Sequence, residues 1–221
     1  MSQSVLPDSY EGIHQRARTL LQSGDVEGAI VLYRRLTDRL NRLTDRILDR
    51  RPQLRDLHRQ ARLELTNLLA GEGRYAEATE VERVLLKTHP DEADTWHRDL
   101  AILRVDKGEV EAGLAELREL AENAPGEPER WLILGVESRL AGQLRDSQNA
   151  LDRALKECQE DDNTNLVNTQ FQRFLLFREM GQVDDALAAW EEAVSRNPDV
   201  VSTVREVYTM LTDEGRYKEA L

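Results

Sequence analysis

The chain has 221 residues, of which 33% are charged and 5% are aromatic, and its formal net charge is −12. The low aromatic content argues against a dense β-sandwich or barrel, and the acidic balance disfavours nucleic acid and anionic lipid as partners. No apolar run reaches the roughly 18 residues that a membrane helix needs, the start lacks the features of a signal peptide, and Cys158 is the single cysteine, so we expect a cytoplasmic protein without disulfides.

A six-residue motif recurs six times along the chain. Each copy begins with glycine, as in GDVEGA at 24–29 and GRYAEA at 73–78, and the glycines are 49, 35, 34, 39 and 34 residues apart. A period near 34 residues with two insertions is typical of stacked units, none of which can bury its apolar face alone. The motif glycines are Gly24, Gly73, Gly108, Gly142, Gly181 and Gly215.

Each unit is predicted to contain two helices joined at its glycine. Apolar residues recur three and four positions apart on both sides of Gly142, for example at Trp131 and Leu134 before it and at Leu144 and Leu151 after it. Such spacing places the apolar side chains on one face of each helix. A helix, a tight turn and a second helix therefore form the repeating element.

The turns between the paired helices also carry sequence signals. Glycine suits the left-handed conformation at a helix C-terminus, and Asp25 and Asp184 are predicted to accept hydrogen bonds from the first amides of the next helix. Proline ends a helix because it lacks the amide donor. Prolines that follow three of the glycines by 17 residues predict the ends of second helices at Pro90, Pro125 and Pro198.

In chain order, we predict a tail at 1–9 and a repeat domain at 10–221. The repeats lie near 10–43, 59–92, 94–127, 128–161 and 167–200, with a truncated sixth repeat at 201–221 and an insertion at 44–58. A stack of repeats needs a polar cap at its end, which the truncated repeat does not supply. We therefore expect the chain to be a segment of a longer protein.

These repeats resemble the tetratricopeptide repeat family, whose pattern is W-x2-L-G-x2-Y, then A-x3-F, then P. Trp131, Leu134 and Gly135 match its first part, and Ala29 with Tyr33 matches its second. The resemblance implies an all-α, right-handed superhelical solenoid of about five and a half helix–turn–helix repeats. Only small side chains let paired helices approach closely, and all six repeats are small at that contact: Ala29, Ala78, Gly113, Ser147, Ala186 and Ala220.

The fifth repeat departs from the family pattern. Arg173 stands where the pattern has a core leucine, and Phe174 stands where it has a small residue. Because five extra residues precede this repeat, the sequence leaves its alignment to the family pattern undetermined by one residue. The sequence therefore also does not decide which face of the helix carries Phe171, Phe174 and Phe177.

The insertion between repeats 1 and 2 is predicted to lengthen both flanking helices into an extended helical hairpin. Apolar residues from Ala29 to Ile47 alternate spacings of four and three, and the pattern continues from Leu54. Residues 34–62 contain ten arginines and four aspartates, a net charge of +6. This basic hairpin is either a solvated helical face or a site for an acidic partner or a second copy, bound through Arg42, Arg46, Arg50, Arg51, Arg55 and Arg59.

The resemblance also implies a concave groove lined by the first helices of successive repeats. Groove positions recur five and nine residues into each repeat, and again one turn later. An apolar strip with cationic neighbours suits an extended or helical peptide with apolar anchors and acidic flanks. The implied groove residues are Leu63, Asn67, Arg98, Ile102, Val105, Leu132, Val136, Arg139, Phe171, Leu175 and Arg178, with Arg205 and Thr209 in the sixth repeat.

The sequence has no pattern typical of a catalytic, cofactor or metal site. No two of the four histidines are four residues apart, as a helical metal site requires, and residues 161–172 lack the glycine and glutamate of a calcium loop. Cys158 has no adjacent histidine and lies near acids, which would raise the pKa of its thiol. We therefore predict no cofactor and no metal.

These patterns predict that the protein functions as a protein–protein interaction scaffold and not as an enzyme. Its predicted partner is a protein or a peptide. The alternative is a structural or self-associating repeat segment of a longer protein whose catalytic or other functional domain lies beyond residue 221. A homo-oligomer is compatible with both interpretations.

Overall fold

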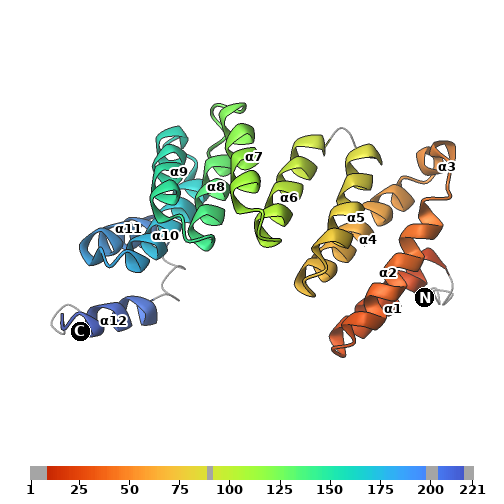
Figure 1. Ribbon diagram of the computed structural model, residues 1–221, viewed down its shortest axis with the longest axis horizontal. Coiled ribbons are helices and arrows are strands. Elements are labelled where there is room, and N and C mark those ends of the chain that lie inside the picture. Colours follow the sequence, from red (N-terminus) through yellow and green to blue (C-terminus); the bar gives the residue numbers. More distant parts are fainter. Residues whose placement is uncertain (1–8, 89–91, 198–203, 217–221) are drawn as a thin grey trace. The chain divides into compact units, whose positions relative to one another are not determined.

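Figure 1 shows the computed structural model, which describes residues 9–88, 92–197 and 204–216. Within these ranges every regular element is a helix, which confirms the prediction of an all-α repeat protein. The chain divides into two compact units, Met1–Glu109 and Val110–Leu221.

The first unit contains two helix–turn–helix pairs, connected by a short helix and followed by one more helix. Its elements are α1 (Tyr10–Gln22), α2 (Val26–Leu40), α3 (Asp45–Arg50), α4 (Pro52–Gly71), α5 (Tyr75–Thr88) and α6 (Ala93–Asp106). Ile13 on α1, Tyr33 on α2 and Leu69 on α4 are fully buried in one hydrophobic cluster. Each fully buried side chain of this kind contributes roughly 1.5–3 kcal/mol, so burial spread over many residues stabilises the unit.

The second unit contains two further helix–turn–helix pairs, α8 with α9 and α10 with α11. Its elements are α7 (Val110–Glu122), α8 (Pro128–Leu140), α9 (Leu144–Glu157), α10 (Asn163–Glu179), α11 (Val183–Arg196) and α12 (Val204–Asp213). Phe174 on α10, Ala186 on α11 and Met210 on α12 are buried in one cluster. Three consecutive helices therefore share a core at this end of the unit.

Every motif glycine adopts the predicted left-handed conformation, with φ between 69° and 96°. In the first turn, the Gly24 amide donates to the Leu21 carbonyl at 3.0 Å, and the Asp25 amide donates to the Leu20 carbonyl at 2.9 Å. These two bonds form a Schellman motif, which satisfies carbonyls that a helix end leaves free. The same two bonds recur at the five other motif glycines. The turns thus repeat in detail along the chain.

The two predicted aspartate caps differ in outcome. Asp25 caps α2, because its Oδ1 accepts a hydrogen bond from the Gly28 amide at 2.9 Å. Asp184 does not cap α11: it lies inside the helix, whose N-cap is Gln182, and it accepts a bond from Arg216 Nη1 at 2.6 Å. The prediction was wrong by position, since only a residue just before the helix can fold its side chain back onto the first amides.

Small residues line the contact between paired helices. Across the α8–α9 pair, Ser147 Oγ donates to the Gly135 carbonyl at 2.7 Å. A Cβ atom at Gly135 would lie 2.6 Å from Leu151 Cδ2, so the two helices approach too closely there for a larger residue. The equivalent small residues Ala29, Ala78, Gly113, Ser147 and Ala186 are all buried. The sixth, Ala220, lies outside the described residues.

The insertion is helical, but it differs from the predicted pair of lengthened helices. The second helix of the first repeat, α2, ends at Leu40, and the inserted residues form the separate short helix α3 before the lengthened α4 begins at Pro52. Proline at the first position of α4 disfavours the helical conformation in the residue before it, and Arg51 is not helical, with φ −137° and ψ 71°. Ile47, which was expected in a continuous apolar seam, is 41% exposed, because the chain turns between α2 and α3.

The fifth repeat resolves the register that the sequence left open. Phe174 and Phe177 are buried, whereas Phe171 is half-buried at the edge of the same cluster. Arg173 stands where the family pattern has a core leucine, but its charge is not isolated. It pairs with Asp152 on α9 at 3.2 Å and lies over the Phe177 ring. The large Phe174 therefore takes part in the core, and the arginine beside it reaches the neighbouring helix.

A carboxyl group is buried in the first unit. Glu82 on α5 is 1% exposed, and neither of its oxygens has a hydrogen-bond partner among the described residues. Burial raises the pKa of Glu82 to about 7, Asp99 acts in the same direction, and Thr66, Arg62 and Arg98 act against the rise. Glu82 is therefore mostly neutral at mildly acidic pH and becomes a buried charge when the pH rises above this value.

We predict that Gly135→Ala destabilises the protein by about 1–3 kcal/mol, because the new methyl group must displace the fully buried Leu151. Gly71→Ala is the matched control: Gly71 also lies in a helix, but a Cβ atom there meets nothing within 4 Å. The control should raise stability by up to about 1 kcal/mol, as alanine favours a helix over glycine. Urea unfolding followed by circular dichroism measures both, and equal effects of the two substitutions would contradict the close contact.

We further predict that Glu82→Gln stabilises the first unit in a pH-dependent way. A carboxyl group whose pKa is higher in the folded state contributes stability that is fully present below pH about 4.5 and is lost as the pH rises through about 7. Glutamine cannot ionise, so its advantage should reach up to about 3 kcal/mol at pH 8 and shrink toward zero near pH 4.5.

The measurement is the free energy of urea unfolding of both proteins between pH 4.5 and 8. The control is Glu80→Gln, which removes an exposed carboxylate from the same helix. An equal stability of wild type and Glu82→Gln at pH 8 would disprove the burial of an unpaired charge.

Candidate functional site

In the first unit, the predicted groove residues lie on the first helices α4 and α6. Leu63 and Ile102 are half-buried, and Asn67 is exposed. Val105 is only 8% exposed, so it adds little surface to a groove. Arg98 is half-buried and pairs with the neighbouring Asp99 at 2.9 Å.

In the second unit, the structure brings predicted groove residues from α8 and α10 together. Val136, Phe171 and Leu175 are half-buried and supply apolar surface, whereas Leu132 is only 9% exposed. Arg139 joins the two helices. The first helices of the fourth and fifth repeats thus lie side by side, with apolar and cationic groups on them.

The polar contacts beside these groove residues of α8 and α10 involve side chains that sequence reasoning missed. Arg139 Nη1 donates to Glu179 Oε1 at 2.5 Å, and Arg139 Nη2 donates to Gln172 Oε1 at 3.4 Å. Leu140, one residue further on α8, is 66% exposed. The helical spacing of four from Val136 to Leu140 was a signal that could have found it.

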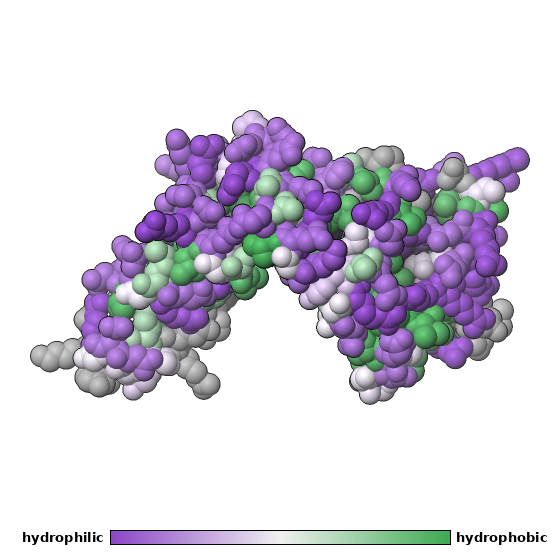
Figure 2. Space-filling model, viewed as in Figure 1, coloured by the Kyte–Doolittle hydropathy of each residue, from purple (hydrophilic) through white to green (hydrophobic). Residues whose placement is uncertain are grey.

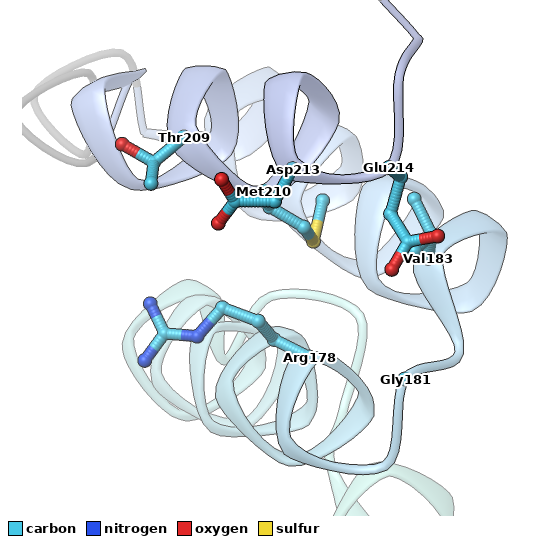
Figure 3. A pocket seen from close by; sticks show the side chains of 7 residues that line it. All are labelled: Arg178, Gly181, Val183, Thr209, Met210, Asp213 and Glu214. Carbon is cyan, nitrogen blue, oxygen red and sulfur yellow. The ribbon is translucent and has the colours of Figure 1, made fainter.

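A cavity of about 420 Å³ opens between α10, α11 and α12. It is lined by Arg178, Gly181, Val183, Thr209, Met210, Asp213 and Glu214 (Figure 3). Arg178 and Thr209 are two of the predicted groove residues, whereas the side chain of Arg205 is not among those described. The Arg178 guanidinium extends below α12, on the side from which Asp213 and Met210 project in Figure 3. This cavity combines a cation, two carboxylates and an apolar floor.

The six arginines predicted on the basic hairpin divide into two groups. Arg55 pairs with Asp49 at 2.8 Å, and Arg59 pairs with Glu92 at 2.7 Å. The other four, Arg42, Arg46, Arg50 and Arg51, are exposed. None of these four side chains has an ion pair or hydrogen bond with another described residue. Hydrophilic residues also cover most of the face of both units seen in Figure 2.

Two further titratable groups, Cys158 and His14, have pKa values that are shifted mainly by burial. Burial, followed by the charge of Asp162, raises the pKa of the Cys158 thiol, which lowers its nucleophilicity at neutral pH. Burial, with the Arg18 charge, lowers the pKa of His14, whose ring lies 5.8 Å from that of Tyr33. Within the described ranges, no three histidine, cysteine or acidic side chains converge as metal ligands. No described helix combines the length and the apolar character needed to cross a bilayer.

Comparisons with solved structures show the same fold in distant proteins. BtubC from P. vanneervenii superimposes with a TM-score of 0.67 at 16% identity, over 88% of this chain and 86% of that chain. A thermophilic tetratricopeptide repeat protein from Thermus thermophilus gives 0.56 at 20% identity, over 92% of this chain and 100% of that one. The Rap conjugation gene regulator of plasmid pLS20, solved in complex with the Phr* peptide, gives 0.51 at 14% identity, over 100% of this chain and 61% of that one.

A search of curated protein sequences gave no match. The family model for the tetratricopeptide repeat matches residues 14–93 and 171–221, which is more than half of the chain. Together with the repeated helix pairs and left-handed glycine turns, this match shows that the chain belongs to the tetratricopeptide repeat family, whose repeats generally mediate protein–protein interactions.

Proposed function

We propose that the protein is an interaction scaffold that binds a peptide or protein segment along the first helices of its repeats. In the second unit, α8 and α10 carry the half-buried Val136, Phe171 and Leu175, with Arg139 and Arg178 near them. A ligand with apolar side chains at a regular spacing and acidic residues beside them is complementary to this surface. Such a ligand gains affinity from apolar burial and orientation from its carboxylates.

The cavity at Arg178 is the observation that carries this proposal. It lies at the C-terminal end of α10, where the predicted row of groove residues continues onto α12 at Thr209. The Arg178 guanidinium carbon lies 5.7 Å from the centre of the buried Phe174 ring, so the cation that lines the cavity is held against an aromatic face. A peptide side chain that enters the cavity meets the apolar Met210 and Val183 together with this cation.

A peptide complex is known for one protein of this fold. The Rap regulator was solved with the Phr* peptide, and the present chain spans 61% of that structure. We infer that the repeat architecture offers a peptide-sized surface here as well.

The same proposal extends to the first unit with a more polar character. Leu63 and Ile102 provide apolar surface there, and Asn67 and Arg98 provide hydrogen-bond donors, while Val105 lies beneath. The second candidate function is that of a self-associating segment. It is favoured by the exposed Arg42, Arg46, Arg50 and Arg51, whose side chains have no ion pair with another described residue.

The proposal is tested by selecting peptide ligands and then measuring their affinity for variants of the groove. Peptides of about 12 residues are selected from a random display library on the wild-type protein, and the affinity of the strongest is measured by fluorescence anisotropy. Val136→Lys should weaken binding at least about tenfold, because a charge replaces an apolar contact. Arg178→Glu should remove the preference for acidic peptides.

The matched control is Val31→Lys, which places the same charge at an exposed valine on α2, a second helix of the first unit. It should leave affinity unchanged, and circular dichroism should show equal helicity in all variants. Peptides that bind Val136→Lys and Arg178→Glu as tightly as the wild type would refute the proposed groove.

A further inference from the structure

Two segments of the chain interrupt the regular repeat spacing, and they have opposite charge. The motif glycines are 34 or 35 residues apart except in the first interval, which is 49, and the fourth, which is 39. The first interval contains the arginine-rich residues 34–62, with a net charge of +6. The fourth contains residues 157–162, where four carboxylates and no cation occur within six residues. The stack needs neither insertion, since the other repeats connect without one.

The arginine cluster, Arg42, Arg46, Arg50 and Arg51, is exposed and has no described counter-charge. Nearby arginines of the same segment behave differently, since Arg55 and Arg59 each pair with a carboxylate. Like charges held close together repel one another, so arginines without a described counter-charge favour an acidic partner. Ile47, 41% exposed on α3, lies within the cluster and adds apolar surface.

The acidic loop, residues 157–162, contains the complementary charges. Glu157 accepts a hydrogen bond from the Gly126 amide at 3.1 Å, and Asp162 accepts one from the Asn165 amide at 3.2 Å. Glu160 and Asp161 are exposed, and their side chains have no partner among the described residues. The loop therefore keeps two free carboxylates in the densest acidic stretch of the chain.

Charge is also divided unevenly along the sequence. Residues 1–109 contain 18 basic and 19 acidic side chains, whereas residues 110–221 contain 12 basic and 23 acidic ones. The second part thus has a net charge of −11 and attracts any cationic surface that approaches it. A second copy of this chain offers that acidic surface at the same concentration as the arginine cluster.

We propose that the arginine cluster of one copy docks on the acidic loop of a second copy. Arginine forks bind carboxylates with two parallel hydrogen bonds, which gives such a contact direction as well as attraction. Each copy carries both surfaces, and they differ, so the contact is head-to-tail. Head-to-tail contacts that do not close into a ring add further copies at both ends.

The experiment is sedimentation velocity of the full chain at about 100 µM protein, without any peptide, in about 20 mM and about 500 mM salt. At low salt the weight-average mass should be at least about 1.5 times the monomer mass of 25.3 kDa and rise with concentration. At high salt it should fall to the monomer mass, because screening weakens exposed ion pairs.

Charge reversal identifies the surfaces. Arg42→Glu/Arg46→Glu/Arg50→Glu and Glu160→Lys/Asp161→Lys should each be monomeric at low salt. The matched control, Arg16→Glu/Arg18→Glu/Arg145→Glu, reverses three exposed arginines outside the cluster and should associate as the wild type does. An equimolar mixture of the two monomeric variants retains the native pair of surfaces and also brings the reversed cluster to the reversed loop, so association should return.

Three results would overturn the proposal. A wild-type protein that is monomeric at low salt would show that the arginine cluster does not hold copies of the chain together. Association that persists in both charge-reversal variants would place the contact elsewhere. A mixture of the two variants that stays monomeric would show that the two surfaces do not meet.

Discussion

The close contact between the two helices of each repeat is the constraint on which the rest of the structure depends. At Gly135 and Ser147 the helices of one pair approach so closely that a side-chain oxygen bonds a backbone carbonyl, and Leu151 fills the space that a larger residue would need. The partners in these contacts are neighbours in sequence, so each core is assembled from local pieces. Exposed ion pairs add little to such a structure, because water and salt screen them.

Much of this architecture could be predicted because it follows from local rules. A left-handed turn needs glycine, and each of the six motif glycines has that conformation. A close helix contact needs a small residue, and Ala29, Ala78 and Ser147 are buried where the repeat places them. For the candidate site, the resemblance to the repeat family placed Val136 and Leu175 on first helices, and these helices prove to be adjacent in the second unit.

Features set by contacts between distant residues could not be predicted. The apolar periodicity continues past Leu40, but the helix ends there, and Asn41 meets His58 from α4 at 2.8 Å. The burial of Glu82 depends on residues of α4 and α6, and the sequence of its own helix, α5, gives no sign of them. The link between Arg139 and Glu179 spans 40 residues, so no local pattern indicates it. Such pairings become visible only when the helices are packed.

The glycine turns and small contact residues have a consequence for how such a chain diversifies. They occupy few positions. The rest of each helix needs only an apolar face and residues that favour a helix. BtubC and the Thermus protein share this fold at 16% and 20% identity, as such sparse requirements allow. Substitutions on the outer faces can therefore accumulate without refolding the chain, and new binding preferences can be explored on a scaffold whose architecture stays fixed.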